Sequence, residues 1–482
     1  MSTEYDAIVV GSGPNGLAAA ITLQQAGLSV LVIEGHSNTG GGLRTAELTL
    51  PGYWSDVCSA IHPMGAGSPF LQTLPLEQFG LEYIHPPVLA AHPFDDGHAA
   101  ILKRDLTETA TLLGNDKDAY LRLLEPVVRD WPGLAPDVLG PLHFPEHPLN
   151  MARFGLQALR SAQSVAKGFR TKEAKGLWAG MAAHSLLSLD TLSTAAVGLV
   201  LMANGHLTGW PLPKGGSQSI AAALVAYFKS LGGKIETGHY VRSLSELPSA
   251  KAILFDITPK QLLEIAGESF NDLYRWQLKK YRYGVGVFKV DWALNGPVPF
   301  TAPECRQAGT VHLGNTIEEI TRSEADVNAG RLNDSPYVLL AQQSLFDPGR
   351  APEGKQVLWG YCHVPHGSTA DRTEIIEKQI ERFAPGFRDL ILDRHTFNTA
   401  QLEEYNPNYI GGDINGGILD IWQLFTRPAL RISPYRTAAK GLYLCSSSTP
   451  PGGGVHGMCG FHAARRALKD LWHINVPLPR KA

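Results

Sequence analysis

The sequence predicts an α/β protein in which one domain is built on a parallel β-sheet and a second domain interrupts it along the chain. Three observations lead to this class. The chain has 482 residues, which is more than a single compact core usually holds. Residues 6–34 follow the order strand, glycine turn, helix, strand. Residues 441–470 repeat the order strand, glycine-rich loop, helix, so we expect both ends of the chain in one domain.

Composition and charge exclude several classes of protein. The formal net charge is -3 and charged residues make up 18% of the chain, so we expect no nucleic-acid partner, because a polyanion needs a basic surface. The five cysteines show no CxxC spacing, which argues against a disulfide framework and a redox pair. The longest apolar stretch, near residues 195–203, is shorter than the about 18 residues of a bilayer span. The sequence shows no basic or Arg-rich leader at its start, so we expect a cytoplasmic protein.

The first glycine turn has the pattern of a dinucleotide-binding fingerprint. Gly11 permits the sharp turn after the strand, Gly13 lets the backbone approach a pyrophosphate, and Gly16 allows the helix to pack on the strand. Amides at the helix N-terminus then stabilise the phosphate charge. The second strand ends at Glu34, where an acid accepts hydrogen bonds from the ribose hydroxyls. The predicted nucleotide-binding residues of the turn are Gly11, Gly13, Pro14, Asn15 and Gly16.

A second glycine cluster follows Glu34 and reads Gly40-Gly41-Gly42-Leu43-Arg44-Thr45. A nicotinamide site does not need such a cluster. The order acid, short spacer, two glycines, two residues, Arg-Thr resembles the glutathione-reductase-type FAD fold of the flavin amine oxidase and phytoene desaturase superfamily. The resemblance implies that Gly41, Gly42 and Leu43 lie along the pyrophosphate of FAD and that Arg44 helps neutralise it. A surface ion pair is the alternative role for Arg44.

The glycine-rich loop before the last helix also contains a GxGxxG pattern. No second strand ending in an acid follows it, which argues against a second dinucleotide site. We interpret it as a loop that wraps the flavin, with the helix N-terminus directing amides at the N1/O2 edge of the isoalloxazine ring. The residues expected to contact the cofactor here are Ser447, Gly453, Gly454, Val455, His456, Gly457 and Met458.

Together with residues 406–417, 427–428 and 434–437, this loop resembles one branch of the superfamily. That branch is the phytoene-dehydrogenase-related oxidoreductases typified by pyridine nucleotide-disulphide oxidoreductase domain-containing protein two. The resemblance implies a glutathione-reductase-type FAD-binding Rossmann domain with a discontinuous α+β substrate domain. We expect the FAD-binding domain over residues 1–80, 206–265 and 426–482, and the substrate domain over residues 81–205 and 266–425.

Two histidines are candidate catalytic residues. His456 lies in the flavin loop and could hydrogen-bond the ring or exchange a proton with substrate, or only hold the loop. His62 lies in a segment that relatives run from the FAD turn toward the ring, and a structural role is its alternative. His456, Cys459 and His462 stand three residues apart, but such steps turn side chains off one helix face, and we expect no metal site. Non-covalent FAD is the expected cofactor.

The expected activity is that of a dehydrogenase or desaturase that transfers hydride from an apolar, lipid- or terpenoid-like substrate to flavin N5, with oxygen or a quinone as electron acceptor. Ala- and Leu-rich helices in 156–169 and 177–205 form either the wall of an apolar cleft or ordinary core. A redox-neutral double-bond isomerase and a flavin-bound interaction protein without turnover are alternatives. Amine oxidation is a weaker alternative, because the last loop lacks an aromatic pair to cage an amine. Peripheral membrane contact is a further expectation, although no basic stripe opposes an apolar face.

Overall fold

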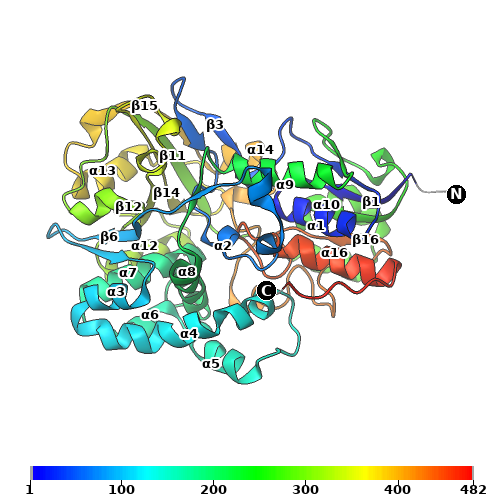
Figure 1. Ribbon diagram of the computed structural model, residues 1–482, viewed down its shortest axis with the longest axis horizontal. Coiled ribbons are helices and arrows are strands. Elements are labelled where there is room, and N and C mark those ends of the chain that lie inside the picture. The colour runs from blue at the N-terminus through cyan, green and yellow to red at the C-terminus, as the bar shows by residue number, and fades with distance from the viewer. Residues whose placement is uncertain (1–3, 480–482) are drawn as a thin grey trace.

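The computed structural model describes residues 4–479 and arranges them around two large β-sheets and a group of helices (Figure 1). The first large sheet is parallel and has the strand order β16-β10-β1-β2-β9. Its strands are β1 (Tyr5–Val10), β2 (Val30–Ile33), β9 (Lys234–Glu236), β10 (Ala250–Phe255) and β16 (Leu442–Leu444). Segments from the start, the middle and the end of the described chain therefore form one sheet.

Helices cover both faces of this parallel sheet because its strands carry apolar side chains on both faces. Ala7 packs in one hydrophobic cluster with Leu17, whereas Ile8 packs in another with Leu262. The helices on the first face are α1 (Pro14–Gln25), α9 (Gln218–Ser230) and α16 (Met458–Leu471). Those on the second face are α10 (Pro259–Ala266) and α11 (Asp272–Lys279). This is the predicted α/β class with a Rossmann-type sheet.

The second large sheet has seven strands in the order β15-β11-β14-β13-β12-β6-β7, and only its β12 and β6 pair in parallel. Val290 and Trp292 of β11 face a hydrophobic cluster that includes Ile376 of α13 (Thr373–Phe383). The alternate residues of the same strand face the other way. The remaining strands are β6 (Val88–Pro93), β7 (Ala99–Leu102), β11 (Gly286–Leu294), β12 (Ala308–Leu313), β13 (Val338–Ala341), β14 (Gln356–Val364) and β15 (Ile391–Phe397).

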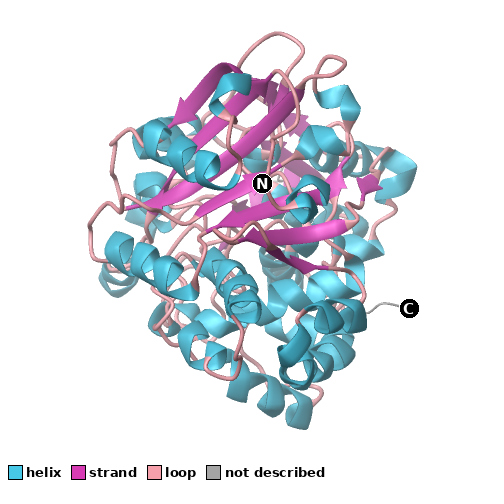
Figure 2. Ribbon diagram, turned by 90° about the vertical axis from the view of Figure 1, so that its left-hand side faces the viewer, coloured by secondary structure: helices cyan, strands magenta, loops and turns pink. Residues whose placement is uncertain are grey.

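A group of helices packs below the seven-stranded sheet in Figure 1, and Figure 2 shows helices filling the lower part of the molecule. They are α3 (Leu106–Leu112), α4 (Lys117–Val138), α5 (Pro148–Ala158), α6 (Ala162–Ala166), α7 (Lys172–Ala182) and α8 (Thr194–Thr208). The sequence prediction of helix throughout 156–169 and 177–205 was wrong in detail. Helix α5 ends at Ala158, and α6 begins after Ser161, whose side chain accepts a hydrogen bond from the Ser164 N–H.

Shorter elements connect these layers. They are α2 (Pro63–Ala66), α12 (Ile317–Asn328), α14 (Thr399–Tyr405), α15 (Ile421–Leu424), β3 (Thr45–Glu47), β4 (Trp54–Asp56), β5 (Tyr83–Ile84) and β8 (Leu212–Pro213). Within residues 4–479, no helix combines the length and the apolar content that crossing a bilayer requires.

Candidate active site

The first glycine turn leaves no room for side chains. Gly11 has a φ of 101°, which favours glycine. A methyl group at Gly13 would lie 2.6 Å from Asp256 Oδ2, and one at Gly16 would lie 2.2 Å from the carbonyl oxygen of Gly11. Helix α1 starts at Pro14, and no side chain caps its N-terminal position at Gly13. The turn therefore presents bare backbone and the positive end of a helix to the cavity, as a pyrophosphate requires.

Asp256 lies directly beneath this turn and was missed by the sequence analysis. It follows β10 at the carboxyl edge of the parallel sheet, and its Oδ2 accepts a hydrogen bond of 2.9 Å from the Gly16 N–H. Burial raises the pKa of this carboxyl to about 7, and the Glu34 charge adds to the effect, against the lowering by the Gly16 N–H. Ligands of α/β sheets bind at the carboxyl edge, so the position after β10 was the signal available.

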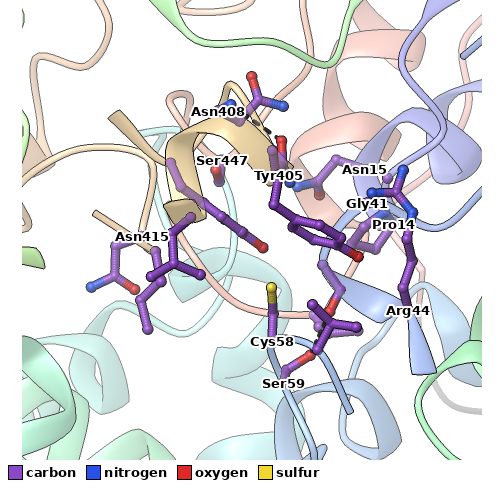
Figure 3. Close-up of a pocket in the computed structure, with 18 of the residues that line it drawn as sticks. Pro14, Asn15, Gly41, Arg44, Cys58, Ser59, Tyr405, Asn408, Asn415 and Ser447 are labelled. Atoms are coloured by element: carbon purple, nitrogen blue, oxygen red, sulfur yellow. Dashed lines mark hydrogen bonds between the residues drawn. The ribbon is translucent and has the colours of Figure 1, made fainter. Parts of the chain in front are cut away.

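Glu34 is held rigidly at the end of β2. Its Oε2 accepts hydrogen bonds from the Ser12 N–H at 2.9 Å and the Ser12 hydroxyl at 2.6 Å, and its Oε1 accepts one from the His36 N–H at 2.8 Å. Arg44 Nη2 lies 3.4 Å from Glu34 Oε1, and the guanidinium carbon of Arg44 lies 5.3 Å from the centre of the Tyr405 ring (Figure 3). With a side chain only 7% exposed, Arg44 does not form the surface ion pair considered as its alternative role.

The second glycine cluster lies against the first. A methyl group at Gly41 would lie 3.1 Å from the Cα of Gly13, and one at Gly42 would lie 2.5 Å from the Tyr409 hydroxyl. Leu43 is fully buried in the core and does not line the cavity. Two glycine segments thus form the walls of one narrow passage, and a side chain at either Gly13 or Gly42 would obstruct it.

Asn15 supplies an amide at the same passage (Figure 3). Its side-chain Oδ1 is buried and has no hydrogen-bond partner among residues 4–479. Rotation of the amide by half a turn exchanges oxygen for nitrogen, so the side chain can offer an acceptor or a donor. A buried polar atom without a partner indicates a place for a ligand. The glycine turn, Glu34 and Asn15 fit a dinucleotide such as FAD.

The glycine-rich loop before α16 closes the passage from the other side. Ser447, Gly454 and Val455 line the cavity, as expected for residues that contact the cofactor. Gly453 does not line it, and a methyl group there would lie 2.7 Å from Asn415 Oδ1. Four further predicted contact residues lie outside the lining, namely Gly16, His456, Gly457 and Met458.

His456 is part of the structure of this loop. Its Nδ1 accepts a hydrogen bond of 3.0 Å from the Met458 N–H in the first turn of α16, and burial lowers the pKa of the ring to about 4. The Met458 amide, which we expected to point at the flavin, is therefore occupied by His456. His456 does not line the cavity. We assign it the loop-holding role, and its predicted catalytic role finds no support in this position.

His62 does line the cavity. Its Nε2 lies 2.8 Å from the Ser217 hydroxyl, which donates its own hydrogen to the Ser59 carbonyl oxygen. Nε2 therefore carries a hydrogen and donates it to Ser217. Burial lowers the pKa of His62 to about 4, although the Asp56 charge raises it. His62 is thus a neutral hydrogen-bonding group at pH 7, and direct contact with a substrate stays a prediction.

One continuous cavity of about 620 Å³ extends from the glycine turns to the seven-stranded sheet. The part lined by α2, α8, the residues after α7 and after α8, and strands β11–β14 is called the inner chamber here. Its apolar residues are Met64, Leu186, Leu201, Trp210, Val287, Leu339 and Trp359, and its polar residues are His184, Lys289, Thr310 and Tyr361. Cavities of this size with few polar groups are typical of small-molecule sites.

A buried charge network supports the wall of this chamber. Lys289 forms an ion pair with Asp291 two residues along β11, and Arg350 Nη2 lies 3.0 Å from Asp56 Oδ2. All four side chains are at most 3% exposed. Burial raises the pKa of Asp291 to about 6, although Lys289 lowers it. Charges at alternating positions of an apolar strand share one face, and this pattern in β11 was a signal that the sequence analysis did not use.

Three residues considered for a metal have separate partners. The Cys459 thiol donates to the Thr449 and Gly452 carbonyl oxygens, and His462 Nε2 lies 3.1 Å from the Leu139 carbonyl oxygen. Within residues 4–479, no group of three His, Cys, Asp or Glu side chains is arranged to hold a metal ion.

The fold and this site together define an FAD-dependent oxidoreductase. A family model described as flavin containing amine oxidoreductase matches residues 15–261, and the chain belongs to this family. The expected resemblance, the FAD cofactor and the oxidoreductase class are thereby confirmed.

Two curated relatives align with almost the whole chain. Pyridine nucleotide-disulfide oxidoreductase domain-containing protein 2 of Rattus norvegicus is 25% identical, with 98% of this chain and 94% of the relative covered. A lycopene-forming phytoene desaturase of Pseudescherichia vulneris is 24% identical, with 96% and 98% covered. Among solved structures, wild-type putrescine oxidase bound to putrescine matches with a TM-score of 0.60 at 16% identity, over 98% of this chain and 99% of that chain. This last likeness shows the fold.

Proposed function

We propose that this protein is a dehydrogenase or desaturase that oxidises an apolar, lipid- or terpenoid-like substrate in the inner chamber. FAD, when bound at the glycine turns, supplies the hydride acceptor at flavin N5. The observation that carries the proposal is the composition of the inner chamber, which is mainly apolar and has no carboxylate among its described lining residues. The relative named as a phytoene desaturase acts, by its name, on a terpenoid, which supports the same substrate class.

The inner chamber favours apolar molecules over amines for an electrostatic reason. An alkylammonium ion that enters a buried cavity loses its water shell and needs an anionic partner. The ionised group on the chamber wall is instead Lys289, whose partner Asp291 does not line the cavity. An apolar substrate loses no hydrogen bonds on entry, and it gains about 25 cal/mol for each Å² of apolar surface removed from water.

The chain's own residues can position such a substrate and keep water away. Leu201 of α8 and Leu339 of β13 both line the chamber. His62, which is neutral at pH 7, lines the cavity without introducing a charge. Oxygen or a quinone is the proposed final electron acceptor.

Anaerobic reduction of the bound flavin tests the proposal. Purified holoenzyme is mixed without oxygen with terpenoids, long-chain lipids and alkylamines, and the visible flavin absorbance is followed. We expect bleaching by members of the first two classes, followed by recovery when oxygen or a soluble quinone is added. Bleaching by amines alone would contradict the proposal. A shifted double bond in the recovered molecule without bleaching would indicate the isomerase, and a flavin that no donor reduces would indicate an interaction protein.

A further inference from the structure

Two hydrogen-bonding groups in the inner chamber each keep one hydrogen-bonding position that no partner among residues 4–479 uses. Trp210 Nε1 donates to Thr310 Oγ at 3.0 Å, which leaves the hydroxyl hydrogen of Thr310 unused. His184 is bonded through Nε2, and its Nδ1 has no hydrogen bond among residues 4–479. Both residues line the cavity. A polar group that loses water without gaining a partner costs about 1–3 kcal/mol, so a ligand that displaces water from this part of the cavity is favoured if it pairs with both groups.

The two groups belong to one rigid corner of the chamber. Nε2 of His184 lies 3.0 Å from Nε2 of His312, and the two rings lie 5.0 Å apart. His312 stands two residues after Thr310 on β12, so both side chains point to the same face of the sheet. The Trp210 ring lies 6.2 Å from the His184 ring. We call His184, Trp210, Thr310 and His312 the polar corner.

The polar corner is uncharged. Burial is the main cause that lowers the pKa of His184 to about 3 and holds the pKa of His312 well below its ordinary value. At pH 7 both rings are therefore neutral, and one Nε2 donates to the other. The Nδ1 of His184 is then either a donor or an acceptor, and the Thr310 hydroxyl is a donor.

Small residues on α7 make room for this arrangement. A methyl group at Gly180 would lie 2.8 Å from the Nδ1 of His312. A methyl group at Gly176, one turn earlier, would lie 2.7 Å from the His92 ring on the neighbouring strand β6. The imidazoles of two adjacent strands are thus packed against glycines of a single helix, which fixes the polar corner in place.

We infer that the polar corner binds an uncharged oxygen of the substrate, a hydroxyl or a carbonyl, and that the substrate is an amphipathic alcohol or ketone, not a bare hydrocarbon. This rests on the proposed function, because it assigns the inner chamber to the substrate. A carboxylate or an ammonium head group would lose its water shell here and would meet only neutral partners, which do not compensate the cost of burying its charge. A hydroxyl or carbonyl oxygen accepts from Thr310 and pairs with His184, so it replaces the hydrogen bonds that it leaves in water.

Matched ligands test this inference on the holoenzyme. Octanol, octane and octylamine are titrated while the visible absorbance of the bound flavin is followed. We expect octanol to bind about tenfold more tightly than either analogue. Thr310→Val and His184→Phe should each reduce this preference to about twofold while octane still binds. Thr396→Val is the matched control, because it makes the same change as Thr310→Val on β15 of the same sheet but outside the cavity lining, and it should leave the preference intact.

The outcomes separate this inference from the proposed function. Equal binding of octane and octanol to the unmodified protein would overturn the inference, as would an unchanged preference in both variants. Flavin bleaching by apolar donors without any head-group preference would support the proposed function and contradict the inference about the polar corner. A clear preference for octanol in a protein whose flavin no donor reduces would support oxygen binding at the polar corner and contradict the proposed function.

A second inference rests on an independent observation, the exposed apolar side chains of two distant segments. Phe144 in the loop before α5 and Leu149 in its first turn are 85% and 82% exposed, and Ile432 in the segment before β16 is completely exposed. Leu142 and Ile432 line the same surface hollow, so the two segments adjoin. We call Leu142, Phe144, Leu149 and Ile432 the apolar patch. Helix α5 lies at the lower edge of the molecule in Figure 1.

Basic side chains lie beside one end of the apolar patch. Arg431 directly precedes Ile432, whereas Arg427 is buried and Arg436 is paired with Asp470. Arg465 and Lys469 of α16 line the hollow itself. Apolar side chains at the surface with basic residues around them match an anionic bilayer, whose hydrocarbon takes up the former and whose head groups attract the latter.

We propose that the apolar patch docks the protein on anionic lipid surfaces. Sedimentation with vesicles of phosphatidylcholine, with and without phosphatidylglycerol, tests it. We expect binding to the anionic vesicles only, weakened by salt and reduced about tenfold by Phe144→Ser or Ile432→Ser. Leu273→Ser is the control, because Leu273 is 65% exposed on α11. Unchanged binding in both patch variants would overturn the proposal, as would a patch that instead joins two copies of the chain, seen as a concentration-dependent mass.

Discussion

Replacement of Asp256 by asparagine should change how stability depends on pH. The pKa of Asp256 rises from 3.8 to about 7 in the folded protein, chiefly through burial. Between these values the folded protein keeps a proton that the unfolded chain releases, so the stability contributed by this group falls as the pH rises through this window. Asparagine cannot ionise and still offers an oxygen to the Gly16 N–H. The stability of Asp256→Asn relative to the unmodified protein should therefore increase as the pH increases.

The size of this gain follows from the shift. About three pH units correspond to about 4 kcal/mol at about 1.4 kcal/mol per unit. For 482 residues the unfolding entropy is about 1 kcal/mol per degree, so the melting temperature of Asp256→Asn relative to the unmodified protein should rise by about 4 °C between pH 4 and pH 8. Differential scanning fluorimetry across this range measures it.

A second buried aspartate provides the control. Although burial opposes it, hydrogen bonds from Thr171 and the Arg170 N–H hold the pKa of Asp116 below its ordinary value. Its stabilising charge is present throughout the range above pH 4 and is lost only below it. Asp116→Asn should therefore lower the melting temperature by a constant amount between pH 5 and pH 8. Parallel curves for Asp256→Asn and the unmodified protein would refute the reasoning about Asp256.

Three other substitutions have clear expectations. Gly16→Ala should yield protein without flavin, measured as visible absorbance per protein, because its methyl group would meet a backbone oxygen at 2.2 Å; Gly296→Ala, with no atom near its methyl group, should keep the flavin. Arg350→Met should cost about 3–5 kcal/mol in unfolding free energy by leaving Asp56 buried without its cation, and an unchanged melting temperature would contradict this. His456→Ala should cost about 1 kcal/mol yet keep flavin reduction within twofold, whereas loss of reduction with full flavin content would restore a catalytic role.

The nucleotide end of the site could be predicted because local sequence dictates it. A GxGxxG turn between a strand and a helix has one geometry, so Gly11, Gly13 and Glu34 were found where the structure has them. The loop before α16 was found for the same reason, but the role of His456 was not. A histidine near a helix start can cap that helix or face a ligand, and only its position decides between the two.

The inner chamber could not be predicted, because its walls come from segments far apart in the sequence. His184 follows α7, and its partner His312 lies on β12, more than a hundred residues later. The apolar patch was missed for a related reason. A sequence can show a basic stripe along one helix, whereas the structure brings Leu142, in the loop before α5, to Ile432 and the basic residues of α16.

The close packing of α16 on α1 affects how the protein is made in the cell. A methyl group at Gly460 would lie 1.8 Å from the carbonyl oxygen of Asn15, so the last helix rests directly on the backbone of the nucleotide turn. During synthesis at roughly 5–20 residues per second, this support emerges from the ribosome roughly 20–90 seconds after the turn itself. A nascent chain therefore exposes an incomplete flavin pocket until α16 has emerged, and flavin capture should follow that step.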